Sequence, residues 1–274
     1  MTGTEARDNA HEATSPRDGG LVAPRPDVIR PAWAGQDLWV GFTTRRGGYS
    51  SGRFAELNFS RRWTAPEAKV AENLGLLAET EGFPAERLYI VTQVHGADGL
   101  AVDGMDPADV LRREADYLTS ARPGRLVGII TADCIPVLLW DPVHRAVAAA
   151  HAGWRGVVAG VVEAVVGHME SKYGTRPEDL LVALGPAIGP CCFEVGSEVA
   201  EHFTERSLVV RLVRGRPHVD LHLAVTHRLE RLGVVPSNTD VVAECTCCNP
   251  DKYHSYRRDG SPIGQHLSFI GIRS

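Results

Sequence analysis

The stretch Thr131-Ala-Asp-Cys-Ile-Pro-Val-Leu-Leu-Trp-Asp-Pro-Val-His-Arg-Ala-Val-Ala-Ala-Ala-His-Ala-Gly-Trp-Arg-Gly156 decides the fold of this chain. Three short apolar runs lie in it or just before it, at 126–130, 137–140 and 146–150. The first and the last of them end in polar residues, a pattern typical of buried strands that carry chemistry at their ends. These ends contribute Cys134 and His151, whose side chains can bind a soft metal or act as a thiol and its base. Pro136 predicts a break just after Cys134, which leaves the thiol in a loop.

A third side chain of this kind, His95, follows an apolar run at 88–94. A single histidine after a strand is usually packed or on the surface, so this one gains weight from Cys134 and His151. We predict that the three side chains meet in one site. Two imidazoles and one thiolate are good ligands for Zn²⁺ or copper, and they leave a fourth position for water or substrate. No local spacing rule supports the set, because its members come from separate strand ends.

The rest of the chain predicts further strands and helices in mixed order. Strands are expected at 38–43, 115–119, 180–184, 240–244 and 266–272, and helices at 66–81, 157–173, 196–206 and 221–233. The elements show no strict βαβ repeat, so the pattern favours a layered α+β domain over a doubly wound sheet.

Composition and charge narrow the class of protein. The chain has 274 residues, 43% of them hydrophobic and 23% charged, with a formal net charge of −5. Such values are typical of a globular enzyme, and the negative charge argues against a nucleic-acid partner, which requires clustered basic residues. Three local pairs, Arg45-Arg46, Arg61-Arg62 and Arg257-Arg258, suit one small anion better than a duplex.

The N-terminal residues, the lack of long apolar stretches and the cysteines predict where in the cell the protein is found. Residues 1–27 are polar and contain Pro and Gly, so we expect a disordered tail before a catalytic domain at 28–274. No apolar stretch approaches the length of a membrane span or a secretory signal, which predicts a cytoplasmic protein without a membrane partner.

The six cysteines are expected to be free thiols, at positions 134, 191, 192, 245, 247 and 248. Vicinal Cys191-Cys192 are expected as small buried residues. Residues 245–248, Cys-Thr-Cys-Cys, resemble part of a metal knuckle, but no second pair at zinc-finger spacing accompanies them except for His254.

Two turns could hold an anion. Residues 43–48, Thr-Thr-Arg-Arg-Gly-Gly, allow backbone N–H groups and Arg45 to face one ligand, although a simple hairpin turn fits the same residues. Residues 153–156, Gly-Trp-Arg-Gly, begin the helix expected at 157–173, so Arg155 and free N–H groups could bind an anion there. A glycine-rich strand-to-helix turn with Trp154 in the core is the competing interpretation.

Several enzyme classes are excluded by missing motifs. The sequence contains no Gly-x-x-x-x-Gly-Lys-Ser/Thr loop, no Gly-x-Ser-x-Gly elbow, no His-Glu-x-x-His and no His-x-Glu with Pro-Cys-x-x-Cys. Its eleven histidines include no His-x-His pair, and a multicopper oxidase needs many imidazoles.

Several linked motifs then occur in order from about residue 38 onward. They are Thr92-Gln-Val-His-Gly96, Thr131-Ala-Asp-Cys-Ile-Pro136, His151-Ala-Gly-Trp-Arg-Gly156, Gly185-Pro-Ala-Ile-Gly-Pro190 with Phe193-Glu-Val-Gly196, and Cys245-Thr246 with Ser255-Tyr-Arg-Arg258. With them the chain resembles the YfiH/YlmD family, once labelled laccase-like or polyphenol oxidase and now treated as purine nucleoside phosphorylases. The resemblance implies a single four-layer α/β/β/α domain. It also implies zinc or copper as the cofactor, held at His95, Cys134 and His151.

The resemblance implies an activity as well. The expected partners are phosphate and the nucleosides adenosine, inosine, guanosine and methylthioadenosine, which would give the base and ribose 1-phosphate, with adenosine deamination as a side activity. Arg45 is the first phosphate-binding candidate, Arg155 is the second, and Gln93 is a further substrate-binding candidate. The chain departs from the family pattern at Gln265 and Leu74, where arginine is common, and in its extra Cys247-Cys248.

Two other functions stay open. Cys134 could be a thiolate nucleophile with His151 or His95 as its base, hydrolysing an amide such as one in a peptidoglycan precursor. The chain could also be a non-catalytic nucleoside- or metal-binding module. The sequence ranks neither the metals nor the purines, and it leaves the oligomeric state open.

Overall fold

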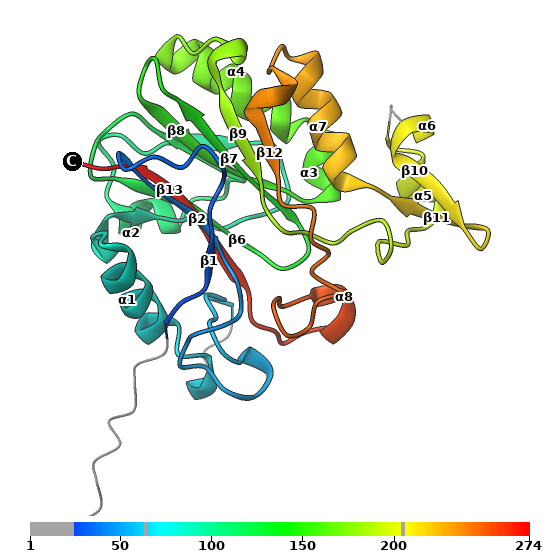
Figure 1. The fold of residues 1–274 in the computed structure, drawn as a ribbon, viewed down its shortest axis with the longest axis horizontal. Coiled ribbons are helices and arrows are strands. Elements are labelled where there is room, and N and C mark those ends of the chain that lie inside the picture. The colour runs from blue at the N-terminus through cyan, green and yellow to red at the C-terminus, as the bar shows by residue number, and fades with distance from the viewer. Residues whose placement is uncertain (1–24, 63–64, 204–205) are drawn as a thin grey trace, which may run out of the picture.

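Two main sheets form the body of the protein (Figure 1). This computed structural model describes residues 25–62, 65–203 and 206–274. The five-stranded sheet has the order β1 (Val28–Ile29), β2 (Leu38–Thr43), β13 (His266–Ile272), β6 (Leu126–Thr131) and β3 (Leu88–Tyr89). The six-stranded sheet has the order β12 (Thr239–Val241), β9 (Leu181–Leu184), β7 (Ile135–Asp141), β8 (Ala146–Ala152), β5 (Tyr117–Ser120) and β4 (Gly99–Ala101).

Most neighbouring strands in both sheets are antiparallel. The exceptions are the pairs β3–β6, β4–β5 and β12–β9, which are parallel and lie at sheet edges. The central strands β2, β6, β7, β8 and β13 are buried along their whole length, so they appear in the sequence as continuous apolar runs rather than as alternating ones.

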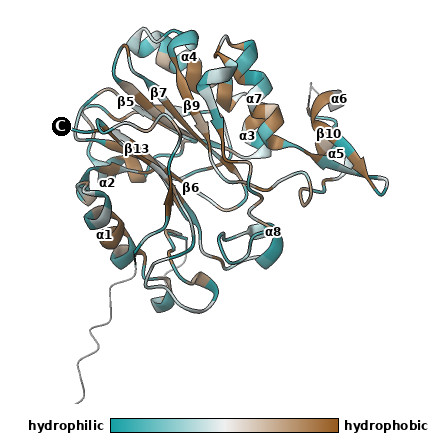
Figure 2. Ribbon diagram, in the orientation of Figure 1, coloured by the Kyte–Doolittle hydropathy of each residue, from teal (hydrophilic) through white to brown (hydrophobic). Residues whose placement is uncertain are grey.

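The core is divided into three clusters. One joins the facing sides of the two sheets, with Val127 and Ile129 of β6 packed among Leu138 and Val147 of the six-stranded sheet. Burial of this interior apolar surface is the main favourable contribution to the stability of the fold. Figure 2 shows the hydrophobic strands in the middle of the molecule and hydrophilic residues on the outer helices.

Helices cover the outer sides of the sheets. Helix α1 (Val70–Glu81) packs Leu77 against Phe269 on the five-stranded sheet. Helices α3 (Trp154–Ala159), α4 (Val161–Tyr173) and α7 (Leu221–Arg231) cover the six-stranded sheet, where Val165 and Val225 belong to the third cluster. The chain is therefore a single mixed α+β domain with two main sheets.

The remaining elements are short. Besides several 3₁₀ turns, they are α2 (Pro107–Leu111), α5 (Ser197–Ala200), α6 (Arg206–Val209), α8 (Tyr256–Asp259) and the hairpin of β10 (Val210–Val213) with β11 (Arg216–Val219). The hairpin projects from the body next to α5 and α6, and α8 lies below the sheets in the view of Figure 1. No helix among the described residues is long and apolar enough to cross a membrane.

Several predicted elements are confirmed and others are corrected. The strands at 38–43 and 266–272 have the predicted bounds. The strand predicted at 88–94 was wrong in length, because β3 ends at Tyr89. The helix predicted at 157–173 is two helices, since Gly160 has a left-handed φ of 90° that interrupts them.

Three further corrections concern shorter segments. The helix predicted at 66–81 begins at Val70, after a 3₁₀ turn, because Lys69 is left-handed. The helix predicted at 196–206 shortens to α5, and the hairpin that follows was not predicted. Of the tail predicted at 1–27, residues 1–24 lie outside the described part; Asp27 is described, and its carboxylate accepts a hydrogen bond from Thr44 Oγ1 at 3.0 Å.

Candidate active site

His95, Cys134 and His151 meet, as the sequence predicts. One imidazole nitrogen of each histidine and the Cys134 Sγ all lie within 4.8 Å of one another. The two imidazole rings have their centroids 4.7 Å apart and are nearly perpendicular. We call these three residues the trio. A thiol and two histidines from three distant parts of the chain therefore face one point.

The sheet and one glycine bring the trio together. Register between β7 and β8 pairs Pro136 with His151, so the loop residue Cys134 lies just beyond the paired ends of the two strands. Gly153 is the first residue after β8. A Cβ atom at this position would lie 2.9 Å from Cys134 Sγ and 3.0 Å from His95 Cδ2. Glycine is required at this position because any side chain would fill the space between the thiol and the imidazole.

Asp116 holds both histidines and was not predicted as a site residue. Its Oδ1 lies 2.8 Å from His151 Nδ1 and accepts the His95 backbone N–H at 2.9 Å. Its Oδ2 accepts the backbone N–H of Gly96 at 2.6 Å. His95 adopts a positive φ of 63°, which these bonds help to stabilise. The only signal in the sequence was a carboxylate beside a buried strand.

The charges of the trio are strongly coupled. Burial would raise the pKa of the Cys134 thiol, but the charge and hydrogen bond of His151, followed by the hydrogen bond of His95, lower this pKa from 9.0 to about 6. Burial would lower the pKa of His151, but the Cys134 charge and the hydrogen bond to Asp116 raise it from 6.5 to about 9. Both shifts favour a thiolate on Cys134 beside an imidazolium on His151 in the metal-free site.

The donor set of the trio fits a metal ion. Histidine and cysteine are both zinc ligands, and three protein ligands that leave a fourth position open are typical of catalytic zinc sites. The carboxylate of Asp116 on the far nitrogen of His151 is the usual partner of a metal-bound imidazole. The thiolate form of Cys134 is the form that binds metal. His95, Cys134 and His151 would hold the ion, and Asp116 would orient two of them.

A cavity of about 610 Å³ opens onto the trio. This volume is within the range typical of small-molecule sites, about 300–1,000 Å³. Four arginines are part of its wall: Arg61, Arg62, Arg155 and Arg257. Aromatic side chains contribute as well, namely Trp154, Phe193 and Tyr256. The cavity therefore combines apolar surface with concentrated positive charge beside the candidate metal ligands.

The predicted substrate-binding residues lie in different places. Arg155 lines the cavity, with its guanidinium 4.7 Å from the ring centre of Trp154. Gln93 also lines it, but its amide bonds both backbone groups of Ile130, at 2.7 and 2.8 Å. Gln93 therefore ties the loop before His95 to the edge of β6.

Arg45 is not brought to the trio. Its Nε donates to the Ala55 carbonyl at 2.7 Å, and its Nη1 donates to the Pro250 carbonyl at 2.8 Å. Arg45 is not among the described residues that line the cavity. Burial, followed by the neighbouring charge of Arg258, lowers its pKa from the usual value. These contacts give Arg45 a role in joining two loops, and its phosphate role stays a prediction.

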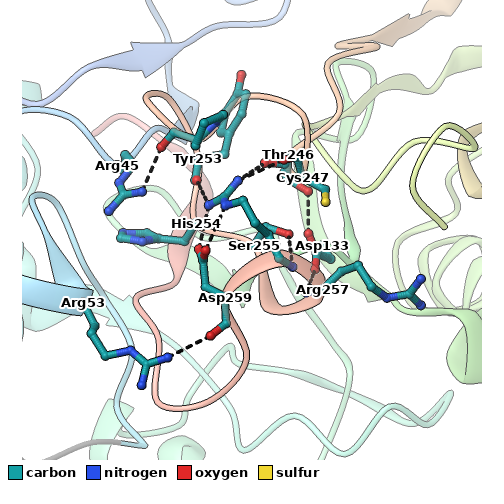
Figure 3. A network of polar contacts seen from close by, with 12 residues as sticks. Arg45, Arg53, Asp133, Thr246, Cys247, Tyr253, His254, Ser255, Arg257 and Asp259 are labelled. Carbon is teal, nitrogen blue, oxygen red and sulfur yellow. Dashed lines mark hydrogen bonds and ion pairs between the residues drawn. The ribbon is translucent and has the colours of Figure 1, made fainter.

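The residue before Cys134 anchors the opposite wall. Asp133 has a positive φ of 86°, and its carboxylate accepts the Thr246 hydroxyl at 2.6 Å and the Arg257 backbone N–H at 2.7 Å. Figure 3 shows Asp133 bonded to both, with Arg45 on the other side of the network. The loop that carries Thr246 and the helix α8 that carries Arg257 are therefore fixed directly to the Cys134 segment.

The family model described as multi-copper polyphenol oxidoreductase laccase matches residues 39–273. The chain belongs to this family. It is the YfiH/YlmD family that the motifs resemble, and the trio falls within the matched residues.

Members of this family include named relatives. The purine nucleoside phosphorylase LACC1 of Mus musculus is 36% identical over 242 residues, covering 85% of this chain and 55% of that protein. This chain thus spans about half the length of that relative. A purine nucleoside phosphorylase of Bacteroides thetaiotaomicron is 36% identical over 84% of this chain and 90% of its own length. The crystal structure of YlmD from Geobacillus stearothermophilus has a TM-score of 0.81 at 33% identity, over 87% of this chain and 93% of that one.

Proposed function

We propose that this protein is a metal-dependent purine nucleoside phosphorylase. It would convert adenosine, inosine, guanosine or methylthioadenosine and phosphate to the free base and ribose 1-phosphate, with adenosine deamination as a side activity. The observation that carries the proposal is the trio opening into a cavity that also contains several arginines. The names of the related purine nucleoside phosphorylases support the same activity.

The arginines suit the nucleophile of this reaction. Among the described residues, Arg61, Arg62 and Arg155 form no ion pair, so their charges are free to bind an anion. Guanidinium groups bind phosphate oxygens in pairs of parallel hydrogen bonds. We place the attacking phosphate against Arg155, with Arg61 and Arg62 as further contacts, and Arg45 stays the untested candidate from the sequence.

The other side chains of the wall suit a nucleoside. Phe193, Trp154 and Tyr256 offer apolar and aromatic surface for a purine base. Phosphorolysis requires the phosphate, the sugar and the base to be aligned, and it develops charge that fixed cationic and anionic groups can stabilise. A zinc or copper ion held by the trio would supply Lewis-acid chemistry to the reaction and to deamination. Asp116 keeps the imidazoles in position for it.

The product distinguishes this activity from hydrolysis. Inosine incubated with the protein and inorganic phosphate should give hypoxanthine and ribose 1-phosphate in equal amounts. Chromatography measures the base, and ³¹P NMR measures the sugar phosphate. Free ribose in place of ribose 1-phosphate would contradict phosphorolysis.

One specific arrangement favours a second function. Cys134, His151 and Asp116 lie in the order nucleophile, base and orienting carboxylate, with a thiol pKa lowered to about 6. This arrangement supports a Cys–His hydrolase of an amide, such as one in a peptidoglycan precursor. Metal analysis of protein purified without added zinc separates the hydrolase from the metal-dependent phosphorylase. A wild type that contains no metal and hydrolyses the amide at full rate would favour the hydrolase.

The proposal also covers the layer arrangement of the fold, the cellular location and the partners of the protein. A four-layer α/β/β/α sandwich is supported by the three core clusters, one between the sheets and one under the helices on each side. A cytoplasmic location is supported by six free cysteines. The proposed partners are nucleosides and phosphate, without nucleic acid or membrane.

A further inference from the structure

Four thiols gather at a second place, where two loops meet. Cys191 and Cys192 follow β9, and Cys245 and Cys248 follow β12. Their Sγ atoms all lie within 4.8 Å of one another, with 3.3 Å between Cys192 and Cys248 and 3.4 Å between Cys191 and Cys248. All four are free cysteines. The expectation that the vicinal pair is buried was wrong, because Cys191 is exposed and Cys192 is only half-buried.

We propose that these four thiols, here called the four-cysteine cluster, form a structural metal site that binds one Zn²⁺ as a tetrathiolate. Zinc–sulfur bonds of about 2.3 Å in a tetrahedron place the sulfur atoms about 3.8 Å apart, so the cluster needs only small side-chain adjustments. Cys245 and Cys248 have the Cys-x-x-Cys spacing of zinc knuckles, and the vicinal pair completes the four ligands. With four protein ligands the site has no open position, unlike the trio.

The backbone around the four-cysteine cluster is shaped for sulfur. The Gly189 N–H donates to Cys245 Sγ at 3.2 Å, and such bonds stabilise a thiolate. A Cβ atom on Gly189 would lie 3.3 Å from Cys191 Sγ, so the absence of a side chain lets the sulfur atoms approach.

The four sulfur atoms are close enough to repel one another once ionised. Thiolates at such distances ionise together only when a metal ion takes up their charge, and the binding of Zn²⁺ releases the protons of the thiols.

Two arginines brace the loops that carry the cluster. Arg257 Nη1 donates to the Cys192 carbonyl at 3.0 Å, and Arg258 Nη1 donates to the Cys247 carbonyl at 3.1 Å. Both guanidinium groups bring positive charge close to a site whose tetrathiolate form is negative. Figure 3 shows Arg257 beside Asp133, with Thr246 and Cys247 on the neighbouring loop.

The cluster would act on the active site through the backbone. Thr246, between two of the ligands, bonds the Asp133 carboxylate and donates its N–H to the Ala187 carbonyl at 2.9 Å. Ile188 donates its N–H to the Asp133 carbonyl at 2.9 Å. A metal ion that joins the two cysteine loops would therefore fix the segment that ends at Cys134. It would stabilise the wall of the cavity without contacting substrate.

Metal content tests the proposal separately from catalysis. Full-length Cys134→Ala protein, which removes the thiolate of the trio, is purified under reducing conditions and equilibrated with buffered Zn²⁺. We expect about one zinc per chain by elemental analysis, and almost none when Cys191→Ser and Cys248→Ser are added. Cys247→Ser in the same background is the matched control, because Cys247 is in the same loop but outside the cluster; it should keep the zinc.

Two results would overturn the proposal. One is the same zinc content with and without the two serine substitutions. The other is an intact mass lower by two or four hydrogens in reduced-purified protein, because disulfides would then have consumed the thiols. If the serine variant fails to fold, Co²⁺ replaces Zn²⁺ in the Cys134→Ala protein. Strong sulfur-to-cobalt charge-transfer absorption is expected, and its absence would reject a tetrathiolate. Neither readout depends on nucleoside phosphorolysis.

Discussion

The Asp116 carboxylate lies 2.8 Å from Nδ1 of His151, and the same oxygen accepts the His95 backbone N–H at 2.9 Å. One carboxylate thus sets the orientation of one imidazole of the trio and the backbone of the other. It also leaves the remaining nitrogen of His151 directed toward the thiol of Cys134. The geometry of the trio is therefore set from this buried position.

Asp116→Asn is expected to weaken metal binding by about 10- to 100-fold, because the carboxylate no longer orients the imidazole or increases its basicity. Zinc dissociation constants are measured with and without Asp116→Asn by competition with a chelating dye. Both proteins also carry Cys191→Ser and Cys248→Ser, so that only zinc bound at the trio is measured. Asp98→Asn is the control, since Asp98 is exposed, and it should leave the constant unchanged. Equal constants for the two variants would remove Asp116 from this role.

Gly153→Ala is expected to reduce kcat/KM for inosine at least about 10-fold, because the new methyl group would lie 2.9 Å from Cys134 Sγ. The backbone of Gly153 is compatible with alanine, so any fall in the thermal midpoint would come from the crowding of the new methyl group against Cys134 and His95. Gly167→Ala in α4 is the control, because its Cβ would meet no atom within 4 Å. That variant should keep full activity and gain about 0.5–1 kcal/mol of stability. An active Gly153→Ala protein would contradict the close approach at the trio.

Alkylation of Cys134 in metal-depleted protein should follow a pKa of about 6. Iodoacetamide labelling of the Cys134 peptide, measured by mass spectrometry from about pH 4 to about pH 10, gives this value directly. Cys191 is an internal reference, because its pKa is raised to about 12 and its labelling should stay slow. A midpoint close to 9.0, the usual value, would mean that the imidazoles do not stabilise the Cys134 thiolate.

The same pair of groups makes the stability of the metal-depleted protein depend on pH. The lowered pKa of Cys134 contributes stability that is present above its usual value of 9.0 and is lost as the pH falls through about 6. The raised pKa of His151 contributes stability that is complete below 6.5 and is lost as the pH rises through about 9. Urea unfolding should therefore show a maximum between these limits that is flattened in Cys134→Ser.

Arg155→Ala is expected to raise the KM for phosphate by about 10-fold or more, since a charge-assisted bond contributes about 1.5–3 kcal/mol. Steady-state rates at varied phosphate and fixed inosine measure the change. Arg231→Ala, at an exposed arginine outside the cavity lining, is the control. Arg45→Ala in the same assay tests the candidate from the sequence; its loop contacts predict lower thermal stability instead. An unchanged KM for phosphate in Arg155→Ala would mean that the phosphate does not bind against Arg155.

The central strands and the trio could be predicted from the sequence because each is marked locally. Strands β2 and β13 are buried along their whole length, so their apolar runs give the correct bounds. Cys134 and His151 follow or end such runs, and strand ends are where polar side chains collect. His95 was placed correctly although β3 ends early, because its position depends on bonds to Asp116 rather than on the strand.

Contacts between distant segments could not be predicted in this way. Asp116 is one carboxylate among many until the fold places it under two histidines. The four-cysteine cluster joins two loops that lie far apart in the sequence, and half of a metal site carries little signal alone. Arg45 was expected to have its guanidinium available for phosphate. Its hydrogen-bond partners, the carbonyls of Ala55 and Pro250, cannot be identified from composition or spacing.

The most direct test of the account is the release of hypoxanthine from inosine at increasing phosphate, using zinc-loaded wild-type protein and Cys134→Ala. For the wild type we predict product that depends on phosphate and matches ribose 1-phosphate mole for mole, and for Cys134→Ala we predict almost none. Hypoxanthine formed equally well without phosphate, or by the Cys134→Ala protein, would contradict phosphorolysis at the trio.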